Sequence, residues 1–457
     1  MNPISKLWSL VASQPDSLAL ASSKLKMNYR DLGDNVARFA AVLLKRGVKH
    51  GDVVGIEAPA ELEAVLVLAC LQLGATSLSV YKTVLDAFRS DIDHLIRVDQ
   101  NMMLELGTVA PLLEPQFLEA EDIVRISFSS GTTGTPKGIP FTAAALNPRT
   151  EDFRELVIEE PFMSLLGLDT VTGFLSLTWA IFNGDTYFIP GTPSENLEVI
   201  SRFGIQMISV SPARLENLLD EQEKRQLELG LKFVLTAGSM ITPSLAARTL
   251  SILGAKMGYV YGSTEVGSAS FGPYVEATPN QVGKLVSDVE FEIVDDNLVP
   301  LPVGEIGNIR YRKPSMPSEY WKSISSRGNG IFEGWFYPGD QGQLTRNNEL
   351  LLLGRNDDLV NAAGNKFNLV QLDLWLQASD MFVDVASFTT SDVAGETEIG
   401  IAFVAKQPPI PEILVKRIRE FLPNLEIKIL MQIDAIPRNK MDKVIRKELQ
   451  LMAKDRQ

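Results

Sequence analysis

Hydrophobic and polar positions in the first part of the chain alternate between a helical and an extended pattern. Between Tyr29 and Arg46 apolar residues recur at helical spacing, which predicts an amphipathic helix with one buried face. Val53–Ile56 and Thr76–Val80 are short apolar runs typical of strands, and the longer apolar segment Leu62–Leu73 between them has the length of a helix. A strand, a helix and a strand in this order predict a parallel sheet with helices on its faces.

The pattern continues and then changes toward the C-terminus. Further strands are predicted at Ile123–Phe128 and Phe233–Thr236, followed by a helix from Pro243 to about Leu253. From Glu290 onward short strands dominate, and after residue 355 a smaller unit mixes strands and helices. We therefore predict a large domain over residues 1–354 and a second domain over residues 355–457.

Composition narrows the class of protein. The 457 residues include 43 Lys and Arg and 57 Asp and Glu, a formal net charge of −14, and so acidic a chain is a poor ligand for nucleic acid. Cys70 is the single cysteine, which excludes an internal disulfide and favours a reducing cytoplasm. Two isolated histidines, His50 and His94, argue against a histidine-bound metal or a Ser-His-Asp hydrolase. We expect neither a signal peptide nor a membrane span.

A loop rich in Ser, Thr and Gly follows the predicted strand at residues 123–128. In Ile126–Gly138, ISFSSGTTGTPKG, backbone N–H groups, hydroxyls and one ammonium are close enough in sequence to face a single triphosphate. Pro136 before Lys137 rules out the Walker loop, which needs Gly before its Lys. A plain surface loop is the alternative. The candidate phosphate-binding residues are Ser129, Ser130, Gly131, Thr132, Thr133, Gly134 and Lys137.

The segment SSGTTGTPKG resembles the signature loop of the adenylate-forming superfamily, which includes acyl- and aryl-CoA synthetases, nonribosomal peptide synthetase adenylation domains and luciferases. Four more segments are similar to its motifs and follow in the family's order: Tyr261–Glu265 (YGSTE), Trp335–Asp340 (WFYPGD), Gly354–Asp358 (GRNDD) and Pro437–Lys443 (PRNKMDK). Two positions depart from the pattern, since Pro338 stands where Thr is usual and Asp442 where Gly is usual.

The resemblance implies both an architecture and a reaction. It implies an α/β fold whose large N-terminal domain has stacked α/β/α lobes and a distorted β-barrel, with a small mobile α+β C-terminal lid hinged near Asp357. It implies that ATP and a carboxylic acid form an acyl-adenylate and pyrophosphate with Mg²⁺, and that the acyl group then passes to the thiol of CoA or of a carrier-protein phosphopantetheine. Partners would be a small carboxylic acid and possibly a carrier protein.

The resemblance also implies roles for individual residues. Lys443 would be the catalytic lysine of the lid, Thr264 would contact the α-phosphate, and Glu265 would bind Mg²⁺, a cation that prefers oxygen ligands. Tyr261 would stack on adenine and Asp340 would accept the ribose hydroxyls. The remaining nucleotide-binding candidates are Gly238, Ser239, Gly262 and Arg355.

The acid-binding segment resembles the family least, because Leu166–Gly173 contains no His. Asp169 or Thr170 falls near the usual His position, and a buried Asp169 would need a partner, either a cationic substrate or a nearby backbone group. The other pocket candidates are Gly258, Val260 and Gly267, and Val260 would narrow the pocket toward a small aryl or short acyl acid. A stand-alone amino-acid-activating enzyme and a non-catalytic nucleotide-binding relative are the alternatives.

Overall fold

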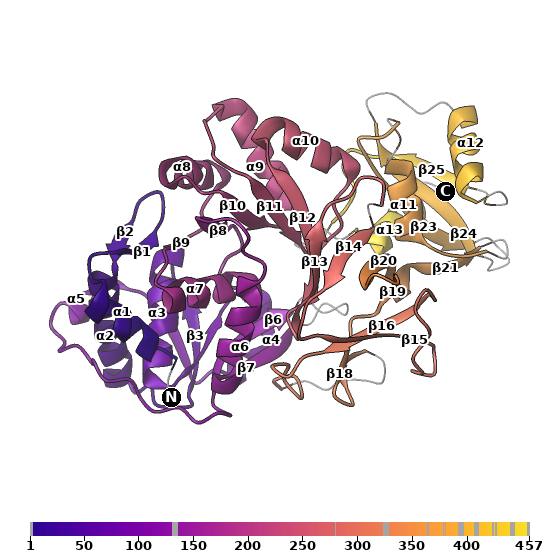
Figure 1. Ribbon diagram of the computed structural model, residues 1–457. Helices are drawn as coiled ribbons and strands as arrows, with labels where there is room; N and C mark the ends of the chain where they lie inside the picture. The colour runs from indigo at the N-terminus through magenta and orange to yellow at the C-terminus, as the bar shows by residue number, and fades with distance from the viewer. Residues whose placement is uncertain are drawn as a thin grey trace.

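The chain forms a mixed α/β fold with a large N-terminal and a small C-terminal domain (Figure 1), as predicted. No helix within the described ranges is long and apolar enough to cross a membrane. The computed structural model describes residues 3–129, 136–278, 280–322, 329–362, 365–377, 379, 381–391, 397–405, 411–422, 425, 427–438 and 444–454.

A five-stranded sheet lies at the centre of the first lobe. Its order is β5-β3-β4-β6-β7, and all neighbours pair in parallel except β6 and β7, which are antiparallel. Residues 64–73 of α3 are all buried, and this part of the helix is apolar on every side except at Gln72. The elements are α2 (Tyr29–Lys45), β3 (Val53–Glu57), α3 (Ala60–Leu73), β4 (Thr76–Ser79), β5 (His94–Arg97), β6 (Ile123–Ser129) and β7 (Lys137–Thr142).

A second, larger sheet passes through the rest of the N-terminal domain. Its strands β8, β10, β11 and β12 are parallel and are covered by α8, α9 and α10, whereas the strands beyond β12 are antiparallel and curve toward the C-terminal domain (Figure 1). The elements of the parallel part are β8 (Phe162–Ser164), α8 (Pro193–Phe203), β10 (Met207–Val210), α9 (Pro212–Arg225), β11 (Phe233–Ala237), α10 (Pro243–Leu253) and β12 (Lys256–Ser263).

The antiparallel part of this sheet leads from the parallel strands to the C-terminal domain. It comprises β13 (Gly267–Pro273), β14 (Gln281–Leu285), β15 (Glu290–Val294), β16 (Gly307–Arg312), β17 (Gly330–Phe332), β18 (Trp335–Tyr337), β19 (Asp340–Leu344) and β20 (Glu349–Arg355). Two helices, α6 (Ala143–Arg154) and α7 (Val171–Asn183), lie between the two large sheets (Figure 1). The remaining elements of this domain are α1 (Ser5–Ser13), β1 (Leu18–Ala21), β2 (Lys26–Asn28), α4 (Lys82–Phe88), α5 (Gln100–Leu106) and β9 (Tyr187–Phe188).

The C-terminal part has hydrophobic clusters of its own. One centres on Leu372 and Ile401 and another on Phe388 and Leu449, and both are separate from the large N-terminal cluster. This separation supports the boundary predicted near residue 355, which stays a prediction. The elements are β21 (Leu359–Ala362), β22 (Asn365–Asn368), α11 (Leu369–Gln377), β23 (Asp384–Ser391), β24 (Thr397–Val404), α12 (Pro411–Phe421), β25 (Ile427–Gln432) and α13 (Arg446–Lys454).

A largely buried arginine connects the last helix to the segment that leaves the N-terminal domain. Arg446 at the start of α13 pairs with Asp358 at 2.7 Å and with Asp373 of α11 at 2.8 Å. Asp358 ends the short 3₁₀ turn η2 (Asn356–Asp358), which directly follows β20. The ion pairs therefore anchor the chain just after the predicted hinge residue Asp357 to the body of the C-terminal domain.

Replacing Arg446 with Met is expected to destabilise the C-terminal domain by about 3 kcal/mol, because breaking a buried ion pair leaves carboxylates without a counter-charge. Hydrogen exchange should then accelerate in α13 and β23 and stay unchanged in β3 and β4. Arg419→Met is the control, since Arg419 is exposed on α12. Equal exchange rates in both variants would contradict a stabilising role for Arg446.

Candidate active site

Two loops that follow neighbouring parallel strands meet at one edge of the larger sheet. β11 pairs with β12, with Ala237 opposite Val260. Gly238 and Ser239 follow β11, and Thr264 and Glu265 follow β12, so both pairs lie beyond the carboxyl ends of their strands. Ligands of open α/β sheets bind beyond these strand ends, which makes this edge the candidate site.

The carboxylate of Glu265 is buried and held between the two lobes. Its side chain is only 5% exposed. Its Oε1 accepts a hydrogen bond of 3.0 Å from the Tyr320 hydroxyl and one of 3.4 Å from Ser129 Oγ. Lys137 Nζ lies 4.9 Å from the centre of the Tyr320 ring. The structure thus brings together Ser129, Lys137 and Glu265, which the sequence analysis had selected from distant segments.

Tyr320 is a site residue that the sequence analysis missed. It lies outside the five motifs, and its neighbour Trp321 donates its backbone N–H to Gly138 O at 2.8 Å, next to Lys137. Burial raises the pKa of the Tyr320 hydroxyl, so it remains a proton donor to Glu265. The only sequence feature that could have indicated this residue is the aromatic pair Tyr320 and Trp321, which lies in a segment without clear periodicity.

A second group of predicted residues meets around Asp340. Tyr261 donates its hydroxyl to Asp340 Oδ2 at 2.7 Å, and Arg355 Nε lies 3.3 Å from Asp340 Oδ1. Burial, and then the nearby Asp340 carboxylate, raise the pKa of Tyr261 well above its ordinary value. Ser239 Oγ is buried and has no hydrogen-bond partner among the described residues. Such a group needs a partner, and a bound nucleotide would supply one.

Several predicted site residues lie outside the described residues. They are Ser130, Gly131, Thr132, Thr133 and Gly134 of the phosphate loop and the lid residue Lys443. The strands that flank the phosphate loop are described, and Ser129 of β6 pairs with Lys137 of β7. Asp357, the predicted hinge, is exposed within η2.

The predicted acid-binding segment contains Asp169, which would need a partner if it were buried. Asp169 is exposed just before the N-cap of α7. Water therefore solvates it, and the need for a buried partner disappears. Thr170 has a capping role: it accepts a hydrogen bond of 3.0 Å from Gly173 N and donates one of 2.8 Å to Gly167 O.

The other pocket candidates lie on β12 and the turn after it. Gly258 is buried, and a Cβ there would come within 2.5 Å of the Phe233 ring. Val260 is half-buried on the same strand. Gly262 faces Gly267 across a tight turn, where a Cβ on Gly262 would lie 2.2 Å from Gly267 O, and Gly267 has a φ of 94°. Glycine is therefore required at both positions of the turn that carries Thr264 and Glu265.

The residues of this site suit a phosphate-bound divalent cation better than a protein-only metal centre. The described residues contain no group of three or more His, Cys, Asp or Glu side chains placed to hold a metal. Both hydrogen bonds that the described residues donate to Glu265 go to Oε1, so Oε2 is the oxygen that could serve as a ligand. Mg²⁺ is commonly held by one or two carboxylates together with phosphate oxygens and water.

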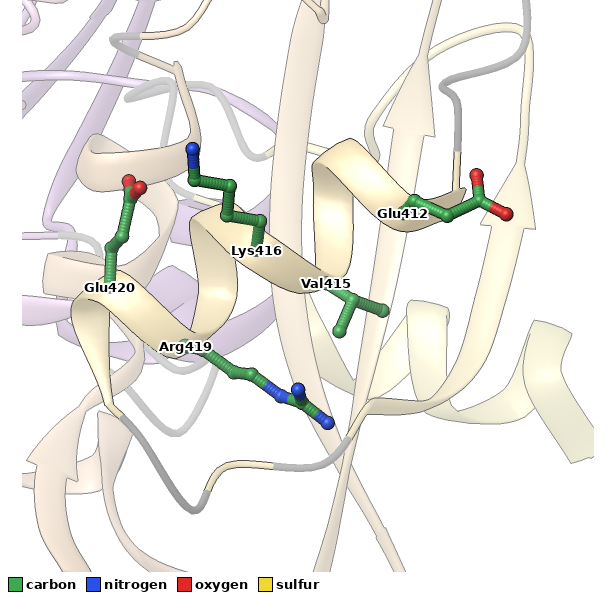
Figure 2. Close-up of a pocket in the computed structure, with 5 residues that line it drawn as sticks. All are labelled: Glu412, Val415, Lys416, Arg419 and Glu420. Carbon is green, nitrogen blue, oxygen red and sulfur yellow. The ribbon is translucent and has the colours of Figure 1, made fainter.

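A separate hollow on the C-terminal domain does not have the form of a binding site. Its lining residues Glu412, Val415, Lys416, Arg419 and Glu420 all belong to α12. Figure 2 shows that Lys416 and Glu420 point to one side of the helix and Arg419 to the other. The side chains do not converge on one point, so the strand-end site is the better candidate.

The comparisons with known proteins agree with this geometry. The chain is 25% identical over 476 residues to a 2-succinylbenzoate–CoA ligase of Geobacillus kaustophilus, covering 95% of both proteins. It is also 25% identical to enterobactin synthase component F of Escherichia coli, covering 98% of this chain and 39% of the synthase.

Solved structures share the fold. An o-succinylbenzoate CoA synthetase from Bacillus subtilis, in complex with its acyl-adenylate intermediate, superposes with a TM-score of 0.83 at 20% identity, covering 97% of each chain. The sequence profile of the family described as AMP-binding enzyme matches residues 7–87 and 89–321. The protein therefore belongs to the AMP-binding enzyme family, the adenylate-forming superfamily indicated by its motifs.

Proposed function

We propose that this protein is an ATP-dependent ligase that activates a small carboxylic acid as an acyl-adenylate and transfers the acyl group to the thiol of CoA. The observation that carries the proposal is the meeting of Ser129, Lys137 and Glu265 at one end of the site and of Tyr261 and Asp340 at the other. The CoA ligases among the relatives support the same reaction.

In the first step a carboxylate oxygen of the acid attacks the α-phosphorus of ATP. The bond from the α-phosphorus to the oxygen bridging to the β-phosphate breaks, and pyrophosphate leaves with that electron pair. Two anions must approach each other, so fixed positive charge and hydrogen-bond donors have to offset their repulsion. Lys137 would serve the β- and γ-phosphates, and Lys443 the attacking carboxylate and the α-phosphate.

Glu265 would hold Mg²⁺, which when bound neutralises phosphate charge. The Tyr320 hydroxyl at 3.0 Å keeps the Glu265 carboxylate in one orientation. At the other end, Asp340 would accept the ribose hydroxyls while Tyr261 stacks on adenine, with Gly238, Ser239 and Gly262 close to the base and Arg355 beside the ribose.

In the second step the sulfur of a deprotonated thiol attacks the acyl carbon. The bond to the AMP oxygen breaks, AMP leaves and a thioester forms. We propose that rotation near Asp357 admits the thiol, and the exposure of Asp357 in η2 supports this. CoA is the proposed acceptor. Enterobactin synthase component F, a multidomain relative, keeps a carrier-protein phosphopantetheine as the alternative. A cytoplasmic location belongs to the proposal, since Cys70 is the single cysteine.

The decisive experiment is ATP–pyrophosphate exchange against a panel of aryl, short acyl, fatty and amino acids. We expect exchange with one class of small aryl or short acyl acid and a loss of about 100-fold or more in Lys443→Ala, because a cation at the reacting atoms is removed. Detectable ATP binding without exchange for any acid would instead favour a non-catalytic nucleotide-binding relative. Exchange confined to amino acids would favour a stand-alone amino-acid-activating enzyme. The exposed side chain of Asp169 does not by itself require the cationic substrate of such an enzyme.

Replacing Val260 with Gly is expected to shift the acid preference toward bulkier substrates. Removing the half-buried side chain would add space beside the proposed acid, and a difference of one methylene group changes substrate discrimination by about 10- to 200-fold. The measurement is kcat/KM for pairs of acids that differ only in size. The acid preference of Val260→Ala should lie between those of the wild type and Val260→Gly. An unchanged preference in both variants would mean that Val260 does not line the acid pocket.

A further inference from the structure

A completely buried arginine lies behind the turn that carries Thr264 and Glu265. Arg149 belongs to α6, the helix that follows phosphate-flanking strand β7, and its side chain is 1% exposed. Its Nη2 donates a hydrogen bond of 2.8 Å to the backbone oxygen of Thr264. Its guanidinium also stacks on the Phe141 ring, 4.2 Å from the ring centre. The contact therefore joins the first lobe to the turn at the end of β12.

This arginine forms no direct ion pair within the described residues, although the carboxylates of Asp152 and Glu265 lie close enough to favour its charged form. Its Nε and Nη1 have no hydrogen-bond partner in the described part of the chain. Asp152, three residues later on α6, is engaged by Lys313 at 3.0 Å rather than by Arg149. Burial lowers the pKa of Arg149 to about 10, so it still carries its proton near neutral pH.

Fold stability alone does not account for such a group. A buried charge with unpaired N–H donors is unfavourable, and apolar side chains of similar volume are often neutral or stabilising replacements. The charge nevertheless lies where the proposed reaction gathers negative charge, next to Glu265, the phosphates and the substrate carboxylate. Preorganised positive charge at such a place stabilises the transition state without reorganisation during the reaction.

We propose that Arg149 is a positioning residue of the active site. It holds the Thr264 carbonyl, and through it fixes the direction of the Thr264 and Glu265 side chains toward the triphosphate. It also supplies fixed positive charge behind the turn. The inference rests on the proposed function, because it assumes that the triphosphate of ATP binds at this turn.

The test compares the binding of Mg·ATP and of adenosine by calorimetry in the wild type, Arg149→Met and Arg149→Lys. Adenosine would contact Tyr261, Asp340 and Gly262 but neither Thr264 nor Glu265. We expect Arg149→Met to weaken Mg·ATP binding about 10- to 100-fold, with the affinity for adenosine unchanged. Arg149→Lys should recover most of the loss, because an ammonium keeps the charge and can still donate to a carbonyl.

Arg125→Met is the matched control. Arg125 is the other arginine among the largest fully buried side chains, and it donates to Leu168 O rather than to the turn. Its ratio of Mg·ATP to adenosine affinity should equal that of the wild type.

Three results would overturn the inference. If Arg149→Met lost affinity for Mg·ATP and for adenosine by the same factor, Arg149 would have a general structural role. If it lost affinity for neither ligand, Arg149 would have no role in the site. If Arg149→Met does not fold, Arg149→Gln takes its place. Its ratio of Mg·ATP to adenosine affinity is then compared with the ratios of the wild type and of Arg149→Lys, and the same outcomes decide. A wild type that binds no Mg·ATP would overturn the proposed function together with the inference, whereas normal wild-type binding with an unaffected variant would overturn the inference alone.

Discussion

Replacing Glu265 with Gln is expected to lower the rate of adenylate formation about 100- to 1000-fold, the loss typical of removing one preorganised electrostatic group. The amide has nearly the same size and its oxygen can still accept from Tyr320, so the turn should keep its shape. What is lost is the negative charge that would bind Mg²⁺. Pyrophosphate exchange measured against Mg²⁺ concentration should therefore show a higher half-saturating concentration as well as a lower maximum.

Two further variants separate this effect from a general loss of packing. Glu63→Gln is the matched control, because Glu63 is a partly buried carboxylate that also accepts a hydrogen bond from a hydroxyl, that of Ser79, but belongs to α3. It should leave the Mg²⁺ dependence unchanged. Tyr320→Phe removes the hydrogen bond to Glu265 together with the one from the Ile331 backbone, and it should raise the Mg²⁺ requirement by less than Glu265→Gln does. If Glu265→Gln lowered the rate with an unchanged Mg²⁺ dependence, Glu265 would not be the metal ligand.

Local patterns predicted the elements of this fold well where periodicity and end signals agree. The helix predicted from Pro243 to about Leu253 is found with these bounds, because Thr242 accepts a hydrogen bond from Leu245 N as its N-cap. The strand predicted at Ile123–Phe128 is also present as β6, and short strands follow from Glu290 as predicted, beginning with β15. The fold class followed from the strand–helix alternation together with the family resemblance.

The site could be predicted only where residues belong to motifs. Tyr261 and Asp340 are far apart in the chain, yet their side chains are hydrogen-bonded, as the resemblance implied for two parts of one nucleotide site. Tyr320 and Arg149 carry no such signal. Each reaches the site through packing between lobes, with Tyr320 arriving beside β7 and Arg149 from α6, and no local spacing encodes such contacts.

The exposure of Asp169 could not be predicted from the sequence either. A polar residue at the start of an apolar helix can face either the interior or water, and the sequence does not decide which. Thr170, the next residue, takes the capping position of α7, and Asp169 is left exposed. The carboxylate then needs no buried partner, and the argument that a cationic substrate must neutralise it no longer applies.

Replacing Asp340 with Asn is expected to weaken ATP binding about 10- to 100-fold. The carboxylate is largely buried and already accepts from the Tyr261 hydroxyl, and a buried acceptor that loses its charge forms weaker bonds to ribose hydroxyls. Calorimetry with ATP and with 2′,3′-dideoxy-ATP tests this directly. The wild type should prefer ATP, and Asp340→Asn should bind both nucleotides almost equally.

The four affinities form a thermodynamic cycle in which the protein loses the Asp340 charge and the ligand loses its two ribose hydroxyls. An effect of the substitution that is the same for both nucleotides therefore cancels. Tyr261→Phe is the matched control, since it removes the other partner of the hydrogen bond but leaves the Asp340 carboxylate and the aromatic ring. It should keep the preference for ATP over the dideoxy nucleotide. If Asp340→Asn lost the same factor for both nucleotides, Asp340 would act by holding Tyr261 and Arg355 in place, and the ribose hydroxyls would have to bind elsewhere.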